Sequence, residues 1–403
     1  MATSGFPRLA WSNLAAQSAE QIGLAAAPMV AVLALGAGAG ETGFLQTAAT
    51  LPFLLLSIPA GVLADRMPRR RLMATAEAVR ALALVATLAL ALSGRLTLAL
   101  LALLAFVGAC GTVAYSVAAP ALVPALVPPA GLAAANARLE LARTVAFVGG
   151  PALAGALVGW TGAGAAFGVA AGLSIGAVFL LAGLREPARA PAPPSHTLQD
   201  LREGSGFVFR HPLLLPILIT QFVFNTFFVL QAVYVPYAVH RLGLSASGVG
   251  VTLAVYGIGM VVGALLAGRI IRVLRFGVVI VIGPLFGLAA ALVMVSTIWM
   301  PTPALAGLSF FLMGVGPILW TIGTTTLRQM VTPERLLGRV SAINIATYGS
   351  RPLGAALGAL VGGLYGSETG LVVAAAGFLI QAVVILVSPV RRLARQSELA
   401  AEA

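Results

Sequence analysis

The sequence predicts an all-α membrane protein with twelve transmembrane helices arranged as two pseudo-symmetric six-helix bundles. Of its 403 residues, 60% are hydrophobic and only 9% are charged, whereas a soluble domain is about half apolar and about a quarter charged. The apolar runs are long and continuous, which excludes a barrel of alternating strands. Polar features of the first half also recur in the second half, which indicates an internal duplication.

Twelve apolar segments are long enough to cross a bilayer, because a spanning helix needs about 20 residues. The first six form a bundle over residues 1–184, and the last six form a second bundle, with a short basic tail, over residues 213–403. We expect the spans at residues 9–36, 42–63, 72–92, 97–119, 138–160, 163–184, 213–239, 246–268, 275–297, 302–327, 340–363 and 369–388.

The connector at residues 185–212 is rich in proline at its start and amphipathic afterwards. In its second part, Leu198, Leu201 and Val208 alternate with charged residues such as Arg202. This pattern favours a helix that lies at the membrane surface, with an ordered loop as the alternative.

The distribution of arginine predicts the orientation in the membrane. All 24 basic residues are arginine, and the abundance of arginine, alanine and leucine is typical of a GC-rich bacterial genome. With the N-terminus in the cytoplasm, 19 arginines fall on the cytoplasmic side, 2 in outer loops and three inside spans. Because cytoplasmic loops carry the excess of positive charge, we expect a multi-pass protein of the bacterial inner membrane with both termini inside.

The two halves share polar residues at matching places. Asn13 and Gln17 in the first span correspond to Gln221 and Asn225 in the seventh, at the same spacing and a shift of 208 residues. The loops after the second and eighth spans also match. In the fifth and eleventh spans an arginine is followed thirteen residues later by a proline: Arg138 with Pro151, and Arg339 with Pro352. Glycines recur every fourth residue in the fifth, eighth and eleventh spans, which favours close helix contacts, expected between the two halves.

The loop after the second span carries small, acidic and basic residues in a distinctive order. A small residue lets a helix end, an acid can cap a facing helix, and arginines lie at the anionic leaflet. A simple positive-inside loop is the alternative. The residues concerned are Gly61, Asp65, Arg66, Arg69 and Arg70.

This loop resembles the signature between the second and third helices of the major facilitator superfamily, with a proline where glycine is usual. The resemblance implies a cytoplasmic gate, in which we expect Asp65 to cap or pair with the start of the eleventh span near Gly338 and Arg339. Residues 135–155, 201–212 and 337–354 are similar to the branch that includes enterobactin exporters and macrolide efflux pumps. That branch implies transport by alternating access. Its members do not share one substrate.

Polar side chains at membrane depth are the candidate functional residues, because they are costly unless they face protein or water. Asn13, Gln17 and Glu20 fall on one face of the first span. The resemblance implies that this face lines a central substrate cavity, with hydrogen bonding between helices as the alternative. The matching residues of the seventh span, with the same two interpretations, are Gln221, Asn225 and Tyr234.

Charged residues inside the spans are candidates for proton coupling. Glu20 and Arg351 are opposite charges near the middle of their spans, and we expect them to face the cavity or each other, with Glu20 carrying the proton. A static pair is the alternative. Glu140 is the next candidate, as either a gate or an anchoring residue with Arg143. Glu77 and its neighbour three residues on, Arg80, are expected to form a local ion pair.

These features predict a secondary active transporter that exports a small amphipathic organic molecule of the drug or siderophore class, by proton-coupled antiport. Proton-coupled uptake of a small metabolite and a non-transporting membrane sensor are the alternatives. We expect no enzyme activity: the absence of lysine excludes Walker A and Schiff-base chemistry, and the Gly-x-Ser-x-Gly motif at residues 172–176 lies inside a span. We also expect no cofactor, no metal site and no nucleic-acid partner. The expected partners are the substrate, protons and the bilayer, and the sequence leaves the oligomeric state open.

Overall fold

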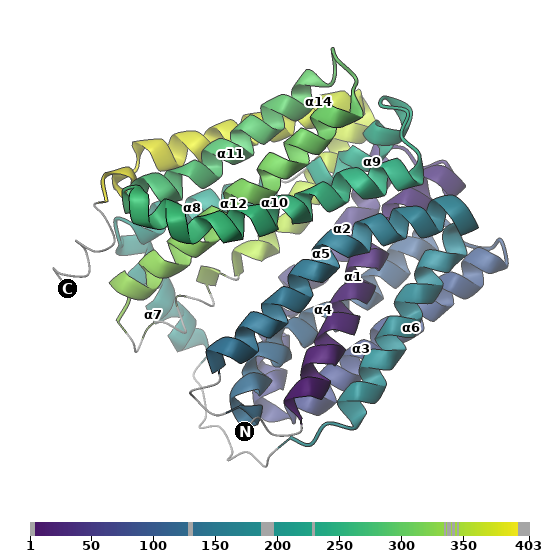
Figure 1. Cartoon of the computed structure of the whole chain (residues 1–403), viewed down its shortest axis with the longest axis horizontal. Coiled ribbons are helices and arrows are strands. Elements are labelled where there is room, and N and C mark those ends of the chain that lie inside the picture. Colours follow the sequence, from purple (N-terminus) through teal and green to yellow (C-terminus); the bar gives the residue numbers. More distant parts are fainter. Residues whose placement is uncertain are drawn as a thin grey trace. The chain divides into compact units, whose positions relative to one another are not determined.

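The computed structural model is helical almost throughout the residues that it describes, which are 5–127, 132–186, 197–227, 230–333, 336, 340, 343, 344 and 346–393. Six long helices come first (Figure 1): α1 (Phe6–Leu35), α2 (Ala39–Arg66), α3 (Arg69–Leu92), α4 (Leu98–Leu126), α5 (Leu132–Thr161) and α6 (Ala163–Ala182).

The connector and the second half follow. Their helices are α7 (Thr197–Arg210), α8 (Leu214–Phe227), α9 (Leu230–His240), α10 (Ala246–Val273), α11 (Phe276–Ser296), α12 (Pro303–Val331), η2 (Thr347–Ser350), α14 (Arg351–Val387) and η3 (Pro389–Arg392).

Ten helical stretches among the described residues are long and apolar enough to cross a membrane. The all-α membrane fold is therefore confirmed. The number of separate spanning helices is ten among the described residues, where the sequence predicted twelve. The seventh span appears as α8 and α9. The eleventh and twelfth spans are joined in α14, which turns at Gly366 with a φ of 84° and a ψ of 165°. Glycine suits this place because a side chain is strained at such a positive φ.

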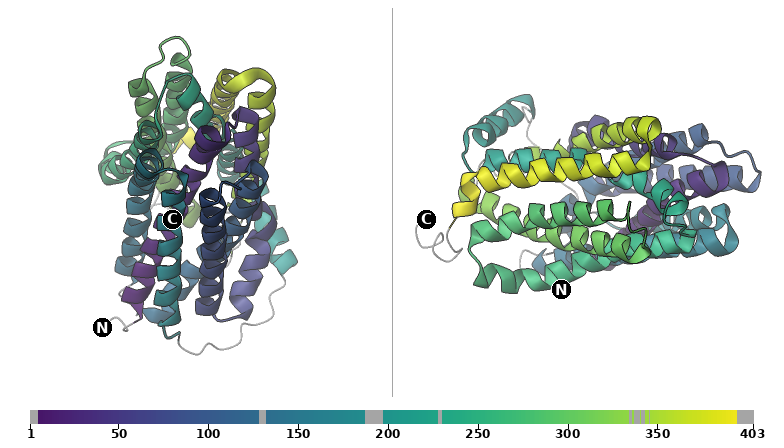
Figure 2. Two further views of the ribbon diagram at one scale, coloured as in Figure 1. Left: turned by 90° about the vertical axis from the view of Figure 1, so that its right-hand side faces the viewer. Right: turned by 90° about the horizontal axis from the view of Figure 1, so that it is seen from above.

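The chain forms two compact units, Met1–Pro193 with Tyr234–Ala254, and Pro194–Val233 with Val255–Ala403. We call them unit 1 and unit 2. The long helices of each unit run alongside one another (Figure 2). The bundle boundaries drawn from the sequence, 1–184 and 213–403, stay a prediction.

In unit 1, α1 packs against α5 and α6, α3 packs against α4 and α6, and α2 packs against α4. Small residues allow these close approaches. A Cβ at Gly111 of α4 would overlap the carbonyl of Ala76 in α3, and one at Gly150 of α5 would overlap Gln21 in α1.

Unit 2 repeats several of these pairings. Helix α8 packs against α14 as α1 packs against α5, and α11 packs against α12 and α14 as α3 packs against α4 and α6. The equivalent pairs support the two pseudo-symmetric bundles that the sequence predicts.

The recurring glycines do mediate close helix contacts, but not all of these join the two halves of the sequence. Gly155 of α5 lies against Gly250 of α10, as expected for a contact between halves. Gly259 of α10 instead meets Phe311 of α12, and Gly354 of α14 meets Thr226 of α8. For these two glycines the expectation was wrong, because they allow close packing inside one half.

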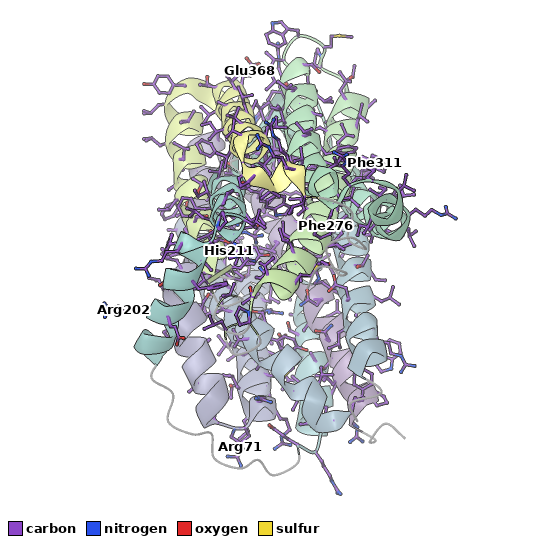
Figure 3. All side chains as sticks on the ribbon, turned by 90° about the vertical axis from the view of Figure 1, so that its left-hand side faces the viewer. Arg71, Arg202, His211, Phe276, Phe311 and Glu368 are labelled. Carbon is purple, nitrogen blue, oxygen red and sulfur yellow. The ribbon has the colours of Figure 1, made fainter. Side chains whose placement is uncertain are left out.

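The expected helix of the connector is present as α7. Its Val208 is buried against Leu214 and Leu336, while Arg202 points away from the neighbouring helices (Figure 3). The amphipathic pattern thus gives a helix with one face on unit 2. A location at the membrane surface stays a prediction.

Candidate functional site

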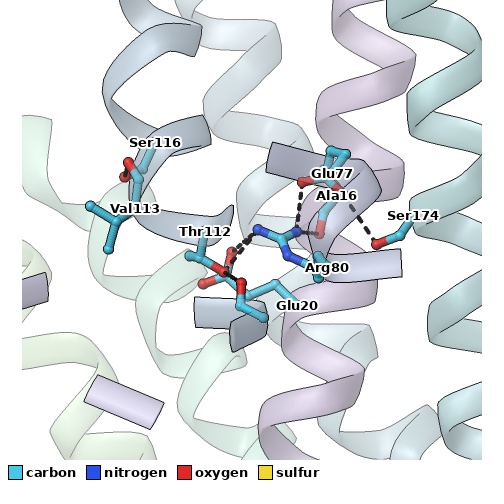
Figure 4. Close-up of polar contacts among 9 residues, drawn as sticks. Ala16, Glu20, Glu77, Arg80, Thr112, Val113, Ser116 and Ser174 are labelled. Atoms are coloured by element: carbon cyan, nitrogen blue, oxygen red, sulfur yellow. Dashed lines mark hydrogen bonds and ion pairs between the residues drawn. The ribbon is translucent and has the colours of Figure 1, made fainter. Parts of the chain in front are cut away.

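A cluster of charged and hydroxyl side chains lies inside unit 1, and we call it the N-terminal cluster (Figure 4). Arg80 of α3 is at its centre and is only 4% exposed. Its Nη1 lies 2.9 Å from Glu77 Oε1 and donates to the carbonyl of Ala16, while its Nη2 donates to Thr112 Oγ1 at 2.8 Å. Glu20 Oε2 of α1 lies 3.9 Å from Arg80 Nη2. Helices α1, α3 and α4 therefore meet at one buried guanidinium.

Two local features hold Arg80 in this place. Glu77 lies three residues earlier on the same helix face, and Ser174 of α6 donates to its second oxygen at 3.1 Å. Gly111 of α4 lets α4 lie close to α3 beside Arg80, because a Cβ at this position would overlap the carbonyl of Ala76. The ion pair expected between Glu77 and Arg80 is thus confirmed.

The two carboxylates of the N-terminal cluster are not equivalent. Glu77 is fully buried and lies at contact distance from Arg80, whereas the side chain of Glu20 is 17% exposed and lies farther away. If both are ionised, two negative charges share one guanidinium. A buried charge is costly unless it is paired, so one of the two carboxylates is incompletely compensated by Arg80.

A second polar cluster lies in unit 2, and we call it the C-terminal cluster. Trp320 Nε1 of α12 donates to Gln221 Oε1 at 2.9 Å, and Arg351 Nε donates to Asn225 Oδ1 at 3.0 Å. The Asn225 side-chain amide also donates to the backbone carbonyl of Gln221 at 2.9 Å. The guanidinium carbon of Arg351 lies 4.5 Å from the ring centroid of Tyr348.

A short 3-10 helix directly precedes Arg351. The expected eleventh span contains the short helix η2 at Thr347–Ser350, and α14 begins directly after it at Arg351. Pro352 has no N–H, so it fits the first turn of a helix, where that donor has no partner within the helix.

Several of the residues predicted to line a cavity have hydrogen bonds to protein. Asn13 donates to the Leu139 carbonyl of α5 at 3.3 Å. Tyr234 is 1% exposed and donates to Thr252 Oγ1 of α10 at 2.5 Å. Gln17 is half-buried on α1. The alternative of bonding between helices is thus realised at several of these positions, and their contact with substrate stays a prediction.

The predicted proton-coupling residues have partners inside their own units. Glu20 faces Arg80 in unit 1, and Arg351 faces Asn225 in unit 2. A direct pairing of Glu20 with Arg351 stays a prediction. Glu140 pairs on α5 with Arg143, whose Nε lies 3.0 Å from both carboxylate oxygens.

The side chains of Gly61, Asp65 and Arg66 lie outside the described part of the structure, as do Gly338 and Arg339. The capping of the eleventh span by Asp65 therefore stays a prediction.

The neighbouring arginines show a contact that the sequence did not reveal. Glu186 accepts the backbone N–H groups of Arg69 and Arg70 at 3.1 and 2.9 Å, and so caps the start of α3. The Arg70 side chain donates to the carbonyls of Ala182 and Leu184 at the end of α6. An acid directly after Arg185 was the only signal for this contact.

Comparison with known proteins identifies the family. A family model described as the Major Facilitator Superfamily matches residues 9–350. The chain belongs to the major facilitator superfamily. It is a multi-pass membrane transporter and not an enzyme.

Relatives within the superfamily include exporters. The chain is 29% identical to the uncharacterized MFS-type transporter y4rN of Sinorhizobium fredii, over 79% of each chain. It is 28% identical to the enterobactin exporter EntS of Escherichia coli, over 81% of this chain and 78% of the exporter.

Solved structures of the superfamily share the fold. A bacterial homologue of the iron transporter ferroportin, in an inward-facing state, has a TM-score of 0.74 and 18% identity, covering 94% of this chain and 97% of that one. The nucleoside transporter NupG has a TM-score of 0.77 and 13% identity, covering 95% and 98%.

Proposed function

We propose that this superfamily member exports a small amphipathic organic molecule, of the drug or siderophore class, in exchange for protons across the bacterial inner membrane. The similarity to EntS supports export. The excess of arginine in alternate loops supports an orientation with both termini in the cytoplasm.

One observation carries the proton coupling: Glu20 and Glu77 share the single guanidinium of Arg80. Glu77 Oε1 lies 2.9 Å from Arg80 Nη1, and Glu77 Oε2 accepts a hydrogen bond from Ser174. Glu20 is the more distant and the more exposed carboxylate. It can therefore exchange a proton with less disturbance of the packed helices, and we assign it the role of proton carrier.

The mechanism follows from the charge of the N-terminal cluster. With Glu20 ionised the three side chains sum to a charge of −1, and with Glu20 protonated they sum to zero. The neutral form tolerates closure away from water, whereas the ionised form favours hydration. A proton taken up from the outer side would permit the movement of the two halves that returns the empty protein to the cytoplasmic side, where the proton leaves and substrate binds.

Everted membrane vesicles test this function, with a substrate identified by screening a deletion strain against antibiotics and siderophores. We expect Glu20→Gln to abolish transport driven by a pH gradient while keeping exchange of substrate down its own gradient. Glu368→Gln, which removes an acid near the turn of α14, is the matched control and should behave as wild type.

Two results would contradict the proposal. Normal pH-driven transport by Glu20→Gln would move the proton site elsewhere, with Glu140 as the next candidate. Accumulation only in right-side-out vesicles would replace export with uptake.

A further inference from the structure

Helix α6 carries a single polar side chain, and this side chain points into the N-terminal cluster. The sequence of α6 consists of alanine, glycine, phenylalanine, valine, leucine and isoleucine, with Ser174 as the exception. Ser174 is 0% exposed, and its Oγ donates to Glu77 Oε2 at 3.1 Å (Figure 4). It is the middle residue of the Gly-x-Ser-x-Gly motif at residues 172–176, which has no role in the transport function as described above.

The hydrogen bond of Ser174 differs from those of other hydroxyl groups in the helices. A serine or threonine inside a helix often donates to the carbonyl four residues earlier. Thr87 Oγ1 does so with Ala83, and Thr47 Oγ1 with Gly43, both at 2.8 Å. Within the described part of the chain, Ser174 donates to the side chain of another helix instead. Its hydroxyl therefore acts on α3 and not on its own backbone.

Ser174 gives the second oxygen of Glu77 a partner. Arg80 Nη1 lies 2.9 Å from Glu77 Oε1, and Ser174 donates to Oε2. Glu20 Oε2 lies farther from the guanidinium, 3.9 Å from Nη2, and this nitrogen donates to Thr112 at 2.8 Å. A hydrogen bond to a carboxylate favours its ionised form. Ser174 therefore favours the form of the cluster in which Glu77 keeps its charge and a proton goes to Glu20.

The ionisable groups around Glu77 come from α1, α3 and α4, and the sequence of α6 supplies none. They are Glu20, Arg80 and Tyr115. Arg80 acts on both acids, and Tyr115 interacts electrostatically with both members of the pair of Glu77 and Arg80. Among the described residues, Ser174 is the side chain that donates to Glu77 without also contacting Arg80 or Glu20. It is therefore the group that distinguishes the two acids.

We propose that Ser174 selects the proton carrier: by holding Glu77 in its ionised form, it leaves the proton to Glu20. Ser174 is thus a positioning residue, because it acts through Glu77 and does not exchange the proton itself. The selection matters because the side chain of Glu20 is 17% exposed and that of Glu77 is 0% exposed, so a proton on Glu77 is shut off from water. The proposal rests on the proposed proton coupling and adds the residue that assigns the proton to one of two acids.

Infrared difference spectroscopy of the full chain in lipid bilayers tests the proposal without a substrate. The probe is the proton alone: the sample is titrated with acid, and the C=O stretch of protonated carboxyl groups is recorded. Glu20→Gln removes the band of the carrier, and Glu20→Asp shifts its frequency. We expect Ser174→Ala to raise the ratio of protonated Glu77 to protonated Glu20 by about tenfold or more, because a hydrogen bond to a charged group is lost. In that background the band should no longer shift with Glu20→Asp.

The matched control is Thr87→Val, which removes another buried hydroxyl of unit 1 that bonds to its own helix. It should leave the proton on Glu20 even where the melting temperature falls. Ser174→Thr keeps the hydroxyl and should behave as wild type. Ser174→Cys has nearly the volume of serine but only a weak donor, so it should act in the same direction as Ser174→Ala and serves if that variant does not fold. Size-exclusion profiles establish that each variant is folded.

The outcomes separate this proposal from the function on which it rests. A band that still shifts with Glu20→Asp in the alanine and cysteine variants of Ser174 would overturn the role of Ser174 and leave Glu20 as the proton carrier. The same loss of the shift in Thr87→Val would also overturn it, because altered packing and not the bond to Glu77 would then move the proton. A wild-type spectrum without such a band, or a band that survives Glu20→Gln, would overturn the assignment of proton coupling to Glu20 and this proposal with it.

Discussion

The N-terminal and C-terminal clusters contain similar amides but differ in their charged residues. Each is built next to a pair of amides at the same spacing on the first helix of its half. Among the described residues of unit 1, Asn13 bonds only to a backbone carbonyl, and the charged centre is Arg80 with two acids. In unit 2, the amides bond to side chains, and Arg351 has no acid among the described residues.

The difference teaches how a duplicated fold can separate two tasks. A carboxylate in suitable surroundings can gain and lose a proton, whereas arginine stays charged. Under the proposed function unit 1 supplies the exchangeable proton, whereas the positive charge of Arg351 in unit 2 stays fixed. The equivalent helix pairs give both halves the same packing, and a few side chains determine the role of each half.

The comparison is broken most severely by removing the centre of the N-terminal cluster. We expect Arg80→Gln to destabilise the protein by about 3–5 kcal/mol, because it leaves Glu77 buried without a counter-charge. The melting temperature in detergent measures this change. Arg95→Gln, an exposed arginine, is the control.

A double variant sharpens the same point. Glu77→Gln combined with Arg80→Gln should recover much of the lost stability, because removing both partners leaves no unpaired charge in the interior. If the double variant melts as low as Arg80→Gln, the ion pair is not the cause of the loss.

The amides give the next largest effect. Asn225→Leu should raise the KM for the transported substrate and cost about 1.5–3 kcal/mol of stability, since it removes a hydrogen bond to the charged Arg351. Asn13→Leu should lower the melting temperature without a change in KM, because its bond goes to the backbone of α5. Equal KM changes in both variants would mean that the two amide pairs act alike.

The cap at the start of α3 gives a smaller expected effect. Glu186 caps α3 with a carboxylate, and we expect Glu186→Gln to cost about 1 kcal/mol, because the charge also interacts with the helix dipole. Hydrogen exchange at Arg69 and Arg70 should increase. Glu203→Gln, an exposed acid on α7, should leave that exchange unchanged.

The smallest expected effect is a pH dependence at the start of α8. His211 Nδ1 accepts the N–H groups of Leu213 and Leu214 at 3.2 and 3.4 Å, and its ring packs against Phe207. Burial lowers the pKa of His211, so the unfolded chain binds its proton more readily. This contribution to stability is present above the unfolded pKa of about 6.5 and is lost as the pH falls through the lower folded pKa. The melting temperature should fall as the pH is lowered below about 6.5. His211→Asn should make the melting temperature depend less on pH.

Hydropathy was sufficient to place the helices but not to describe their ends and breaks. The apolar runs predicted nearly all of the helical stretches because burial in a bilayer requires them. The turn at Gly366 and the short helix before Arg351 depend on single backbone positions inside an apolar run, which periodicity does not reveal. The change of helix type before Arg351 was indicated only by Pro352.

The site was predictable where partners are close in sequence. Glu77 and Arg80 are three residues apart on one helix, so their pairing followed from helix geometry. The partner of Glu20 depends on which turn of α1 meets α3, and this is fixed by small residues such as Gly111 that allow the helices to approach. Glu186 lies more than a hundred residues from Arg69 in the chain, so its contact required the three-dimensional structure.

One buried tryptophan, Trp320, allows unit 2 to be followed by fluorescence. Of the four tryptophans, Trp11, Trp160 and Trp299 are 64%, 81% and 74% exposed, whereas Trp320 is 5% exposed and bonds to Gln221. Replacing the three exposed residues by phenylalanine would leave a single emitter inside the C-terminal cluster. Its emission wavelength would then report changes of polarity around Gln221 in the unlabelled protein, including those that accompany each transport cycle.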